Sequence, residues 1–115
     1  MHELSIAKNI IDIASESARQ NHINRIIEIE IEVGSVSGIV IESLEFALEM
    51  SVRDTVLENA KTTIIKIPGK AKCLNCNLEF EIDSYYAQCP ECQLYNFDVI
   101  QGKELRVKSL ITDEK

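Results

Sequence analysis

Hydrophobic and polar positions alternate along this chain with two different periods, and each period predicts one kind of element. Residues 3–20 carry apolar side chains at helical spacing with charged side chains opposite them, which predicts an amphipathic helix. The positions expected to face the core are Leu4, Ala7, Ile10, Ile11, Ala14 and Ala18. From residue 26 to 33 the period changes to two, which predicts a half-buried strand. Its inner face is expected to carry Ile27, Ile29, Ile31 and Val33.

A second helix and two further strands are predicted after the glycine-rich turn at residues 34–38. The helix is expected over about residues 42–59, with Leu44, Leu48, Val52 and Val56 along one stripe and Phe46 and Met50 beside it. Met50 is expected to fill the core. The strands are expected at residues 62–67, ending at Pro68-Gly69, and at residues 103–111.

This order of elements predicts a small α/β (α+β) fold. Two helices would pack beside a three-stranded sheet, and a zinc-ribbon domain would be inserted before the last strand. We expect residues 1–68 and 103–115 to form the α/β domain and residues 69–102 to form the ribbon. The outer face of the first strand carries Glu28, Glu30 and Glu32. These glutamates could bind a cation, but a solvated outer face is the simpler interpretation.

All four cysteines of the chain lie in the inserted segment, in two pairs with the spacing of metal ligands. Cys73 and Cys76 are separated by two residues, as are Cys89 and Cys92, and twelve residues lie between the pairs. Two such pairs can surround one ion with four thiolates, which favours tetrahedral zinc in a closed, structural site. An iron site of rubredoxin type is the alternative. A redox dithiol is disfavoured, because one pair would suffice for it.

The charge of the chain restricts its partners. Nineteen acidic residues against twelve basic ones give a net charge of −7, so phosphate backbones and anionic membranes are disfavoured partners. Residues 69–102 alone carry a net charge of −3, from two lysines and five acidic residues, unlike ribbons that bind nucleic acid. We find no segment typical of a signal peptide or of a membrane span and expect a cytoplasmic protein. No paired nucleophile and base and no phosphate-binding loop suggest catalysis.

The opening residues Met1, His2 and Glu3 form a candidate site for a second metal. Histidine is too large to permit removal of Met1, so the terminal amine, the His2 amide nitrogen and the His2 imidazole can form fused chelate rings. A deprotonated amide is a strong donor that favours square-planar Ni(II) or Cu(II) over tetrahedral Zn(II). Glu3 could supply the fourth ligand. His22, at the end of the first predicted helix, is expected to be a solvated cap rather than a ligand.

Three stretches together resemble the HypA/HybF family of hydrogenase nickel-incorporation proteins. They are MHELSIA, IEVGSVSGI and the pairs CLNC and CPEC, and the similarity covers nearly the whole chain. The resemblance implies an N-terminal α/β domain that binds Ni(II) through His2, with Met1 and Glu3 as candidate helpers. It also implies a ribbon that binds zinc through Cys73, Cys76, Cys89 and Cys92. Some relatives have histidines at the cysteine pairs, but no histidine follows His22 here, so we expect zinc to stay bound by thiolates alone.

The resemblance also implies a function and partners. Family members deliver nickel to the precursor of the large subunit of [NiFe]-hydrogenase together with a GTPase partner, and some also serve urease. We therefore expect a nickel metallochaperone that is not an enzyme. The alternative is a zinc-ribbon adaptor that joins proteins and delivers no metal. The β-rich residues 62–68 could exchange between two copies, so a homodimer is left open by the sequence.

Overall fold

The computed structural model describes residues 3–113, and these residues belong to two compact units. The first, which we call the helical unit, contains the described residues up to Glu32, then Val40–Ile65, and those from Arg106 onward. The second, the cysteine unit, contains Val33–Ile39 and Lys66–Leu105. The predicted division into a nickel-binding domain and a zinc ribbon concerns what these parts do, and it stays a prediction.

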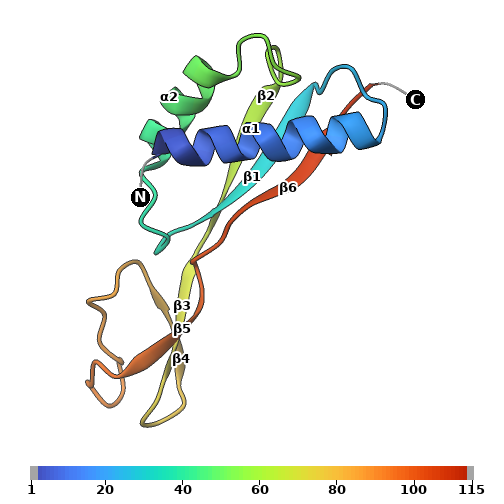
Figure 1. Cartoon of the computed structure of the whole chain (residues 1–115). Helices are drawn as coiled ribbons and strands as arrows, with labels where there is room; N and C mark the ends of the chain where they lie inside the picture. The colour runs from blue at the N-terminus through green and yellow to red at the C-terminus, as the bar shows by residue number, and fades with distance from the viewer. Residues whose placement is uncertain (1–2, 114–115) are drawn as a thin grey trace. The chain divides into compact units, whose positions relative to one another are not determined.

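Two helices and two three-stranded sheets make up the fold, as the sequence predicted for its α/β class (Figure 1). The helices are α1 (Glu3–Gln20) and α2 (Ile41–Ser51). The first sheet has the order β2-β1-β6 and contains β1 (Glu28–Gly34), β2 (Lys61–Ile67) and β6 (Leu105–Ile111). The second sheet has the order β4-β3-β5 and contains β3 (Gly69–Cys73), β4 (Glu79–Ile82) and β5 (Phe97–Gln101).

Hydrogen bonds give the strand directions in the first sheet. The Ile27 N–H donates to the Ile111 carbonyl and the Gly34 N–H to the Glu104 carbonyl, so β6 runs antiparallel to β1. On the other edge the Lys61 N–H donates to the Ile27 carbonyl and the Ser35 N–H to the Ile67 carbonyl, so β2 is parallel to β1. A parallel neighbour requires a crossover connection, and α2 provides it.

The core of the helical unit lies between α1, α2 and the inner face of β1. The α1 residues buried there are Ile6, Ala7, Ile10, Ile11, Ala14 and Ala18. Leu4, which was expected in this set, is 49% exposed, and Ile6, two residues further along, is buried although it was not predicted to be. On β1, Ile29, Ile31 and Val33 are buried as predicted, whereas Ile27 lies before the strand and is 38% exposed.

The second helix is shorter than the sequence predicted and presents a different outer face. It ends at Ser51, and residues 53–59 form turns rather than two further helical turns. Asp54 adopts a left-handed backbone with φ of 61°, a conformation that cannot continue a right-handed helix. The expectation that Met50 fills the core is wrong, because this side chain is 56% exposed. Leu57 in the turn segment is buried instead.

The cysteine unit has a small core of its own. Strand β3 is central and pairs antiparallel with β4 and β5, so that Gly69 lies opposite Ile82 and Cys73 opposite Phe97. The buried residues Val36, Ala71 and Ile82 pack with the partly buried Phe80, Ala87, Phe97 and Val99. Phe80 and Phe97 meet edge to face, with ring centroids 5.8 Å apart. Residues 78–82 alternate apolar and acidic side chains, which predicts the strand seen as β4, whereas β3 and β5 are additional strands.

Three glycines allow the backbone of the cysteine unit to pack very closely where the chain segments meet. A Cβ atom on Gly34 would lie 1.9 Å from the Gly102 carbonyl oxygen, and one on Gly102 would lie 2.6 Å from the Gly69 Cα. Gly102 also has φ of 111°, which side chains rarely adopt. Any larger residue at Gly34 or Gly102 therefore collides with main chain.

Among the residues that the structure describes, no helix combines the length and the hydrophobicity needed to cross a bilayer.

Candidate metal centre

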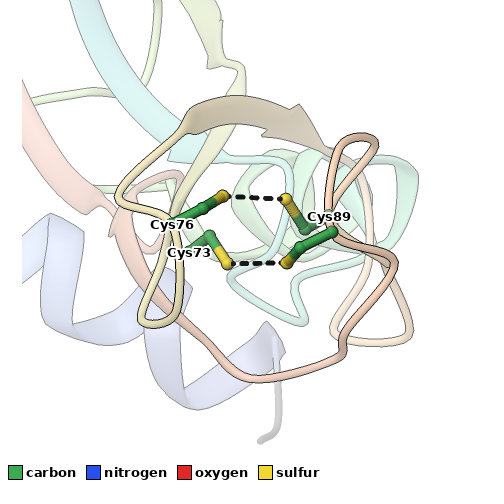
Figure 2. A group of neighbouring side chains, drawn as sticks. Cys73, Cys76 and Cys89 are labelled. Atoms are coloured by element: carbon green, nitrogen blue, oxygen red, sulfur yellow. Dashed lines mark hydrogen bonds between the residues drawn. The ribbon is translucent and has the colours of Figure 1, made fainter.

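The four cysteine sulfurs lie together, as their spacing predicted. All four Sγ atoms are within 4.8 Å of one another. Cys73 Sγ is 3.3 Å from Cys92 Sγ, and Cys76 Sγ is 3.6 Å from Cys89 Sγ (Figure 2). Four thiolates bound to one ion at about 2.3 Å in a tetrahedron would stand about 3.8 Å apart. The donor set and its spacing therefore fit one tetrahedral ion.

Each cysteine pair is held by its own backbone turn, and the two turns have the same hydrogen bonds. In the first pair the Asn77 N–H donates to the Cys73 carbonyl, and in the second the Gln93 N–H donates to the Cys89 carbonyl, at 3.0 and 2.9 Å. Asn77 and Gln93 both have a left-handed backbone, with φ of 65° and 61°. Each turn is closed by a bond from the first cysteine N–H to a carbonyl five residues ahead, on Leu78 and on Leu94. The repeated turn makes each pair present both sulfurs on one side.

Neighbouring groups lower the pKa of two of the four cysteine thiols and raise the pKa of the other two. Backbone N–H groups of Cys76 and Asn75 point at Cys73 Sγ and lower its pKa to about 6, against the opposing effect of desolvation. The equivalent N–H groups of Cys92 and Glu91 lower the pKa of Cys89. Without metal, the first cysteine of each pair is therefore the stronger acid.

The second cysteine of each pair behaves in the opposite way. At Cys76 the Leu78 N–H lowers the pKa, but burial and bonds to the neighbouring sulfurs outweigh it and raise the pKa to about 12. At Cys92 the Leu94 N–H has the same lowering effect, and the bond to Cys73 together with burial raises the pKa overall. The backbone donors that produce these differences were not identifiable from the spacing of the cysteines.

The predicted nickel residues are only partly within the described chain. Met1 and His2 lie outside the described residues. Glu3 begins α1, and its Oε2 accepts a hydrogen bond of 3.2 Å from the Val40 N–H, at the residue that precedes α2. This contact between the starts of the two helices was not predicted from the sequence. His22 is exposed beyond the end of α1, with φ of 56°, and it does not belong to the cysteine cluster.

The three glutamates on the outer face of β1 are half-buried and hydrogen-bonded to the neighbouring strands. Glu28 accepts a bond of 2.7 Å from Thr63 Oγ1 of β2. On β6, Ser109 donates to Glu30 and Arg106 pairs with Glu32. These carboxylates join the three strands across the sheet, so we assign them a structural role.

Comparison with known proteins gives one consistent result. A family model for hydrogenase/urease nickel incorporation, metallochaperone, hypA matches residues 1–112. The hydrogenase maturation factor HypA of Geobacter metallireducens is 39% identical over 110 residues, which span 96% of this chain and 97% of that protein. The protein of the same name from Geotalea daltonii is 42% identical with the same coverage.

A solved structure extends this similarity to the fold. The solution structure of the Ni metallochaperone HypA from Helicobacter pylori matches with a TM-score of 0.70 and 26% identity, over 96% of this chain and 97% of that one. The family match, the curated relatives and the fold thus cover the same nearly complete stretch of sequence. This chain therefore belongs to the HypA family of metallochaperones for hydrogenase and urease nickel incorporation.

Proposed function

We propose that this protein binds Ni(II) at its N-terminus and delivers it during maturation of [NiFe]-hydrogenase. The observation that carries the proposal is the family match, which includes both the opening MHE residues and the four cysteines. The same family description names urease, so we include urease among the candidate clients. The protein acts as a carrier: it holds the ion and exchanges it onto a client's ligands, and it catalyses no reaction.

We assign Ni(II) to His2, with the Met1 amine and Glu3 completing the ligand set. An amine, a deprotonated amide and an imidazole form the square-planar donor set that Ni(II) accepts and Zn(II) does not favour. The Glu3 carboxylate already accepts a bond from the Val40 N–H. If nickel binds the same Glu3 oxygen, this bond has to be exchanged, so a change at the metal would be felt at the start of α2.

We assign structural zinc to Cys73, Cys76, Cys89 and Cys92. The proposal is supported by the mutual distances of the sulfurs and by the two matching turns. Four thiolates leave no open coordination position for a substrate. Zinc would hold the two turns together and would keep the surface of the cysteine unit in one shape for docking.

The proposed partners are the precursor of the hydrogenase large subunit and a GTPase that acts in the same maturation pathway, in the cytoplasm. Transfer requires a partner whose thiolates compete for nickel. The net charge of −7 makes nucleic acid and anionic membranes poor partners. A homodimer, formed by exchange of residues 62–68 between two copies, is the alternative to a monomeric carrier.

A nickel titration of the untagged protein tests this proposal. The native protein should bind one tight Ni(II) per chain by calorimetry and show the absorption bands of square-planar nickel. His2→Ala should lose this binding while it keeps its zinc. His22→Ala is the matched control and should behave as the native protein. A further variant with one residue added before Met1 removes the amine from its chelate ring and should bind weakly.

Hydrogenase maturation in cells provides the functional test. His2→Ala should abolish nickel-dependent hydrogenase activity at low nickel, and His22→Ala should not. If the native protein and His2→Ala bind nickel equally weakly and the variant matures hydrogenase normally, the delivery function is wrong. The protein is then better described as a zinc-ribbon adaptor that brings other proteins together.

A further inference from the structure

The outer face of α2 exposes two large apolar side chains that the fold does not use. Phe46 is 64% exposed and Met50 is 56% exposed. They are four residues apart on one helix and therefore lie one above the other on the same face. We call this pair the α2 ridge. The opposite face of α2 is buried through Leu44, Ala47 and Leu48, so the ridge contributes nothing to the core.

A groove of about 720 Å³ lies on the flank of the same helix. It is lined by α2, by the turns that follow it and by the beginning of β2: Glu45, Leu48, Glu49, Val52, Arg53, Asp54, Glu58, Ala60 and Thr62. Four of these side chains are acidic and one is basic, which gives the groove a net charge of −3. Its floor is partly apolar, from Leu48 and Val52.

Two glutamates mark the boundary between the ridge and the groove. Glu45 and Glu49 both line the groove and are both exposed. Each precedes one ridge residue directly in the sequence, so the two rows run side by side along α2. A third exposed glutamate, Glu42, lies one turn before Phe46. The helix itself contains no Lys or Arg. The surface therefore combines an apolar strip with a parallel row of negative charge.

We propose that the α2 ridge and its groove form a docking site for a basic amphipathic segment of a partner protein. Apolar side chains of that segment pack on Phe46 and Met50, and its Lys or Arg side chains pair with Glu45 and Glu49 and enter the groove. This is the helix-in-groove mode of peptide recognition, with complementary charge giving selectivity. The inference concerns the nickel-free protein and does not depend on nickel binding.

Charge also argues against other occupants. A second copy in a symmetric pair would place Glu45 and Glu49 against the same residues, and like charges facing one another are unfavourable. A nucleic acid or an anionic membrane meets the same repulsion. A bare cation would use the carboxylates but would leave the apolar ridge uncovered. A basic segment with an apolar stripe satisfies both halves of the surface.

Peptide binding to the full-length protein tests the proposal. The probe is a fluorescein-labelled synthetic helix of lysine and leucine, with leucines at helical spacing and lysines flanking them. A scrambled peptide of identical composition, without the apolar stripe, is the control for general attraction to an acidic protein. Binding is measured by fluorescence anisotropy. We expect the amphipathic peptide to bind the native protein about tenfold more tightly than the scrambled one.

Variants then locate the binding. Glu45→Lys with Glu49→Lys should weaken binding by at least about tenfold, and raising salt from about 0.05 to 0.5 M should weaken the native complex similarly. Phe46→Ser with Met50→Ser should also weaken binding, without the change in salt dependence. Asp83→Lys with Asp98→Lys makes the same change in net charge in the cysteine unit, where both residues are exposed, and should bind the peptide nearly as tightly as the native protein.

Three results would overturn the proposal. The first is equal loss of binding in the Asp83/Asp98 variant, because attraction would then follow net charge alone. The second is equal affinity for the scrambled peptide. The third is a native dimer, measured by analytical ultracentrifugation, that Glu45→Lys with Glu49→Lys converts to monomers, because a second copy would then be the occupant. All six substituted side chains are exposed, and circular dichroism checks that each variant is folded.

Discussion

At the residue scale, the four cysteines have the same ligand spacing but different acidities. Cys73, with a pKa of about 6, is a thiolate at neutral pH, whereas Cys76, with a pKa of about 12, keeps its proton. Cys89 is shifted in the direction of Cys73 and Cys92 in the direction of Cys76. Metal ligands must be deprotonated, so Cys76 has to lose its proton when an ion binds, whereas Cys73 does not.

This difference predicts the number of protons released on zinc binding. Near pH 7.5 we expect between about one and three protons per zinc ion, because Cys73 is already a thiolate and Cys76 still has to lose its proton. Lowering the pH towards 6 protonates Cys73 as well, so more protons are released and the apparent affinity falls. Calorimetry of the metal-free, reduced protein in buffers of different ionisation enthalpy measures this number. Release of four protons, or of none, at pH 7.5 would contradict the assignment.

A second prediction at this scale compares Gly34 with Gly38, four residues later in the same turn segment. Gly34→Ala places a Cβ atom 1.9 Å from the Gly102 carbonyl oxygen, and main chain cannot yield easily, so we expect a loss of more than about 3 kcal/mol in unfolding free energy. Gly38 has a positive φ of 82°, and a Cβ atom added there would meet nothing within 4 Å. Gly38→Ala should therefore cost only about 1 kcal/mol. Urea denaturation of the two variants compares them, and equal losses would contradict the packing argument.

Single residues were well predicted where chemistry depends on spacing alone. Two cysteine pairs predict a cluster because the local turn fixes each pair. The unequal acidities could not be predicted, because they arise from backbone N–H groups whose directions depend on the folded turn and not on the spacing of the cysteines. The same limit applies to Glu3, whose partner Val40 is distant in sequence.

At the element scale, α2 shows why a hydrophobic pattern can mislead. The segment Ile41–Ser51 has apolar residues on most sides, so spacing alone does not distinguish its inner face from its outer face. Leu44 and Leu48 were predicted to be buried and are buried, but Met50 and Phe46 are not. The predicted length of α2 was also wrong. Val52 and Val56 continue the apolar spacing in the sequence, but the left-handed backbone at Asp54 is incompatible with a helix there.

Stability measurements should separate the two faces of α2. Leu44 is fully buried, so Leu44→Ala leaves a cavity and should cost about 2–5 kcal/mol of unfolding free energy. Met50→Ala removes a similar volume from an exposed position and should change the stability by less than about 0.5 kcal/mol. Chemical denaturation followed by circular dichroism gives both values. A large loss in Met50→Ala would mean that this side chain is covered in solution.

At the scale of the whole molecule, the two units differ in what stabilises them. The helical unit buries side chains from two helices and a strand. The buried hydrophobic cluster of the cysteine unit has three members, Val36, Ala71 and Ile82, with four partly buried neighbours. A core this small rarely folds without further support, which the proposed zinc ion would supply.

Metal removal should therefore affect the two units unequally. Treating the reduced protein with a strong zinc chelator should collapse the amide NMR signals of Lys66–Leu105, while signals from α1 and β1 stay dispersed. Re-addition of zinc should restore them, and Cys76→Ser should reproduce the collapse without chelator. Persistence of a fully dispersed spectrum after verified zinc loss would show that the small core is sufficient.

The overall class of fold was predictable because strong periodicities mark α1, β1, β2 and β6. The short strands β3 and β5 were not predicted, because each has only five residues, which are too few to show a clear alternation. The contribution of Val36 to the cysteine unit was also beyond prediction. This residue is distant in sequence from Ala71 and Ile82, and only the folded chain brings the three together.

Val36 has a consequence for how such a protein can change over evolution. The cysteine unit consists of two stretches of chain, and the shorter one carries Val36, whose N–H donates to the Gly102 carbonyl at 2.9 Å. A recombination event that moved Lys66–Leu105 alone into another gene would leave Val36 behind and open the core. The cysteine unit therefore cannot be transferred to another protein as the single segment Lys66–Leu105. Its lineage is expected to diversify by substitution within the intact chain rather than by exchange of its parts.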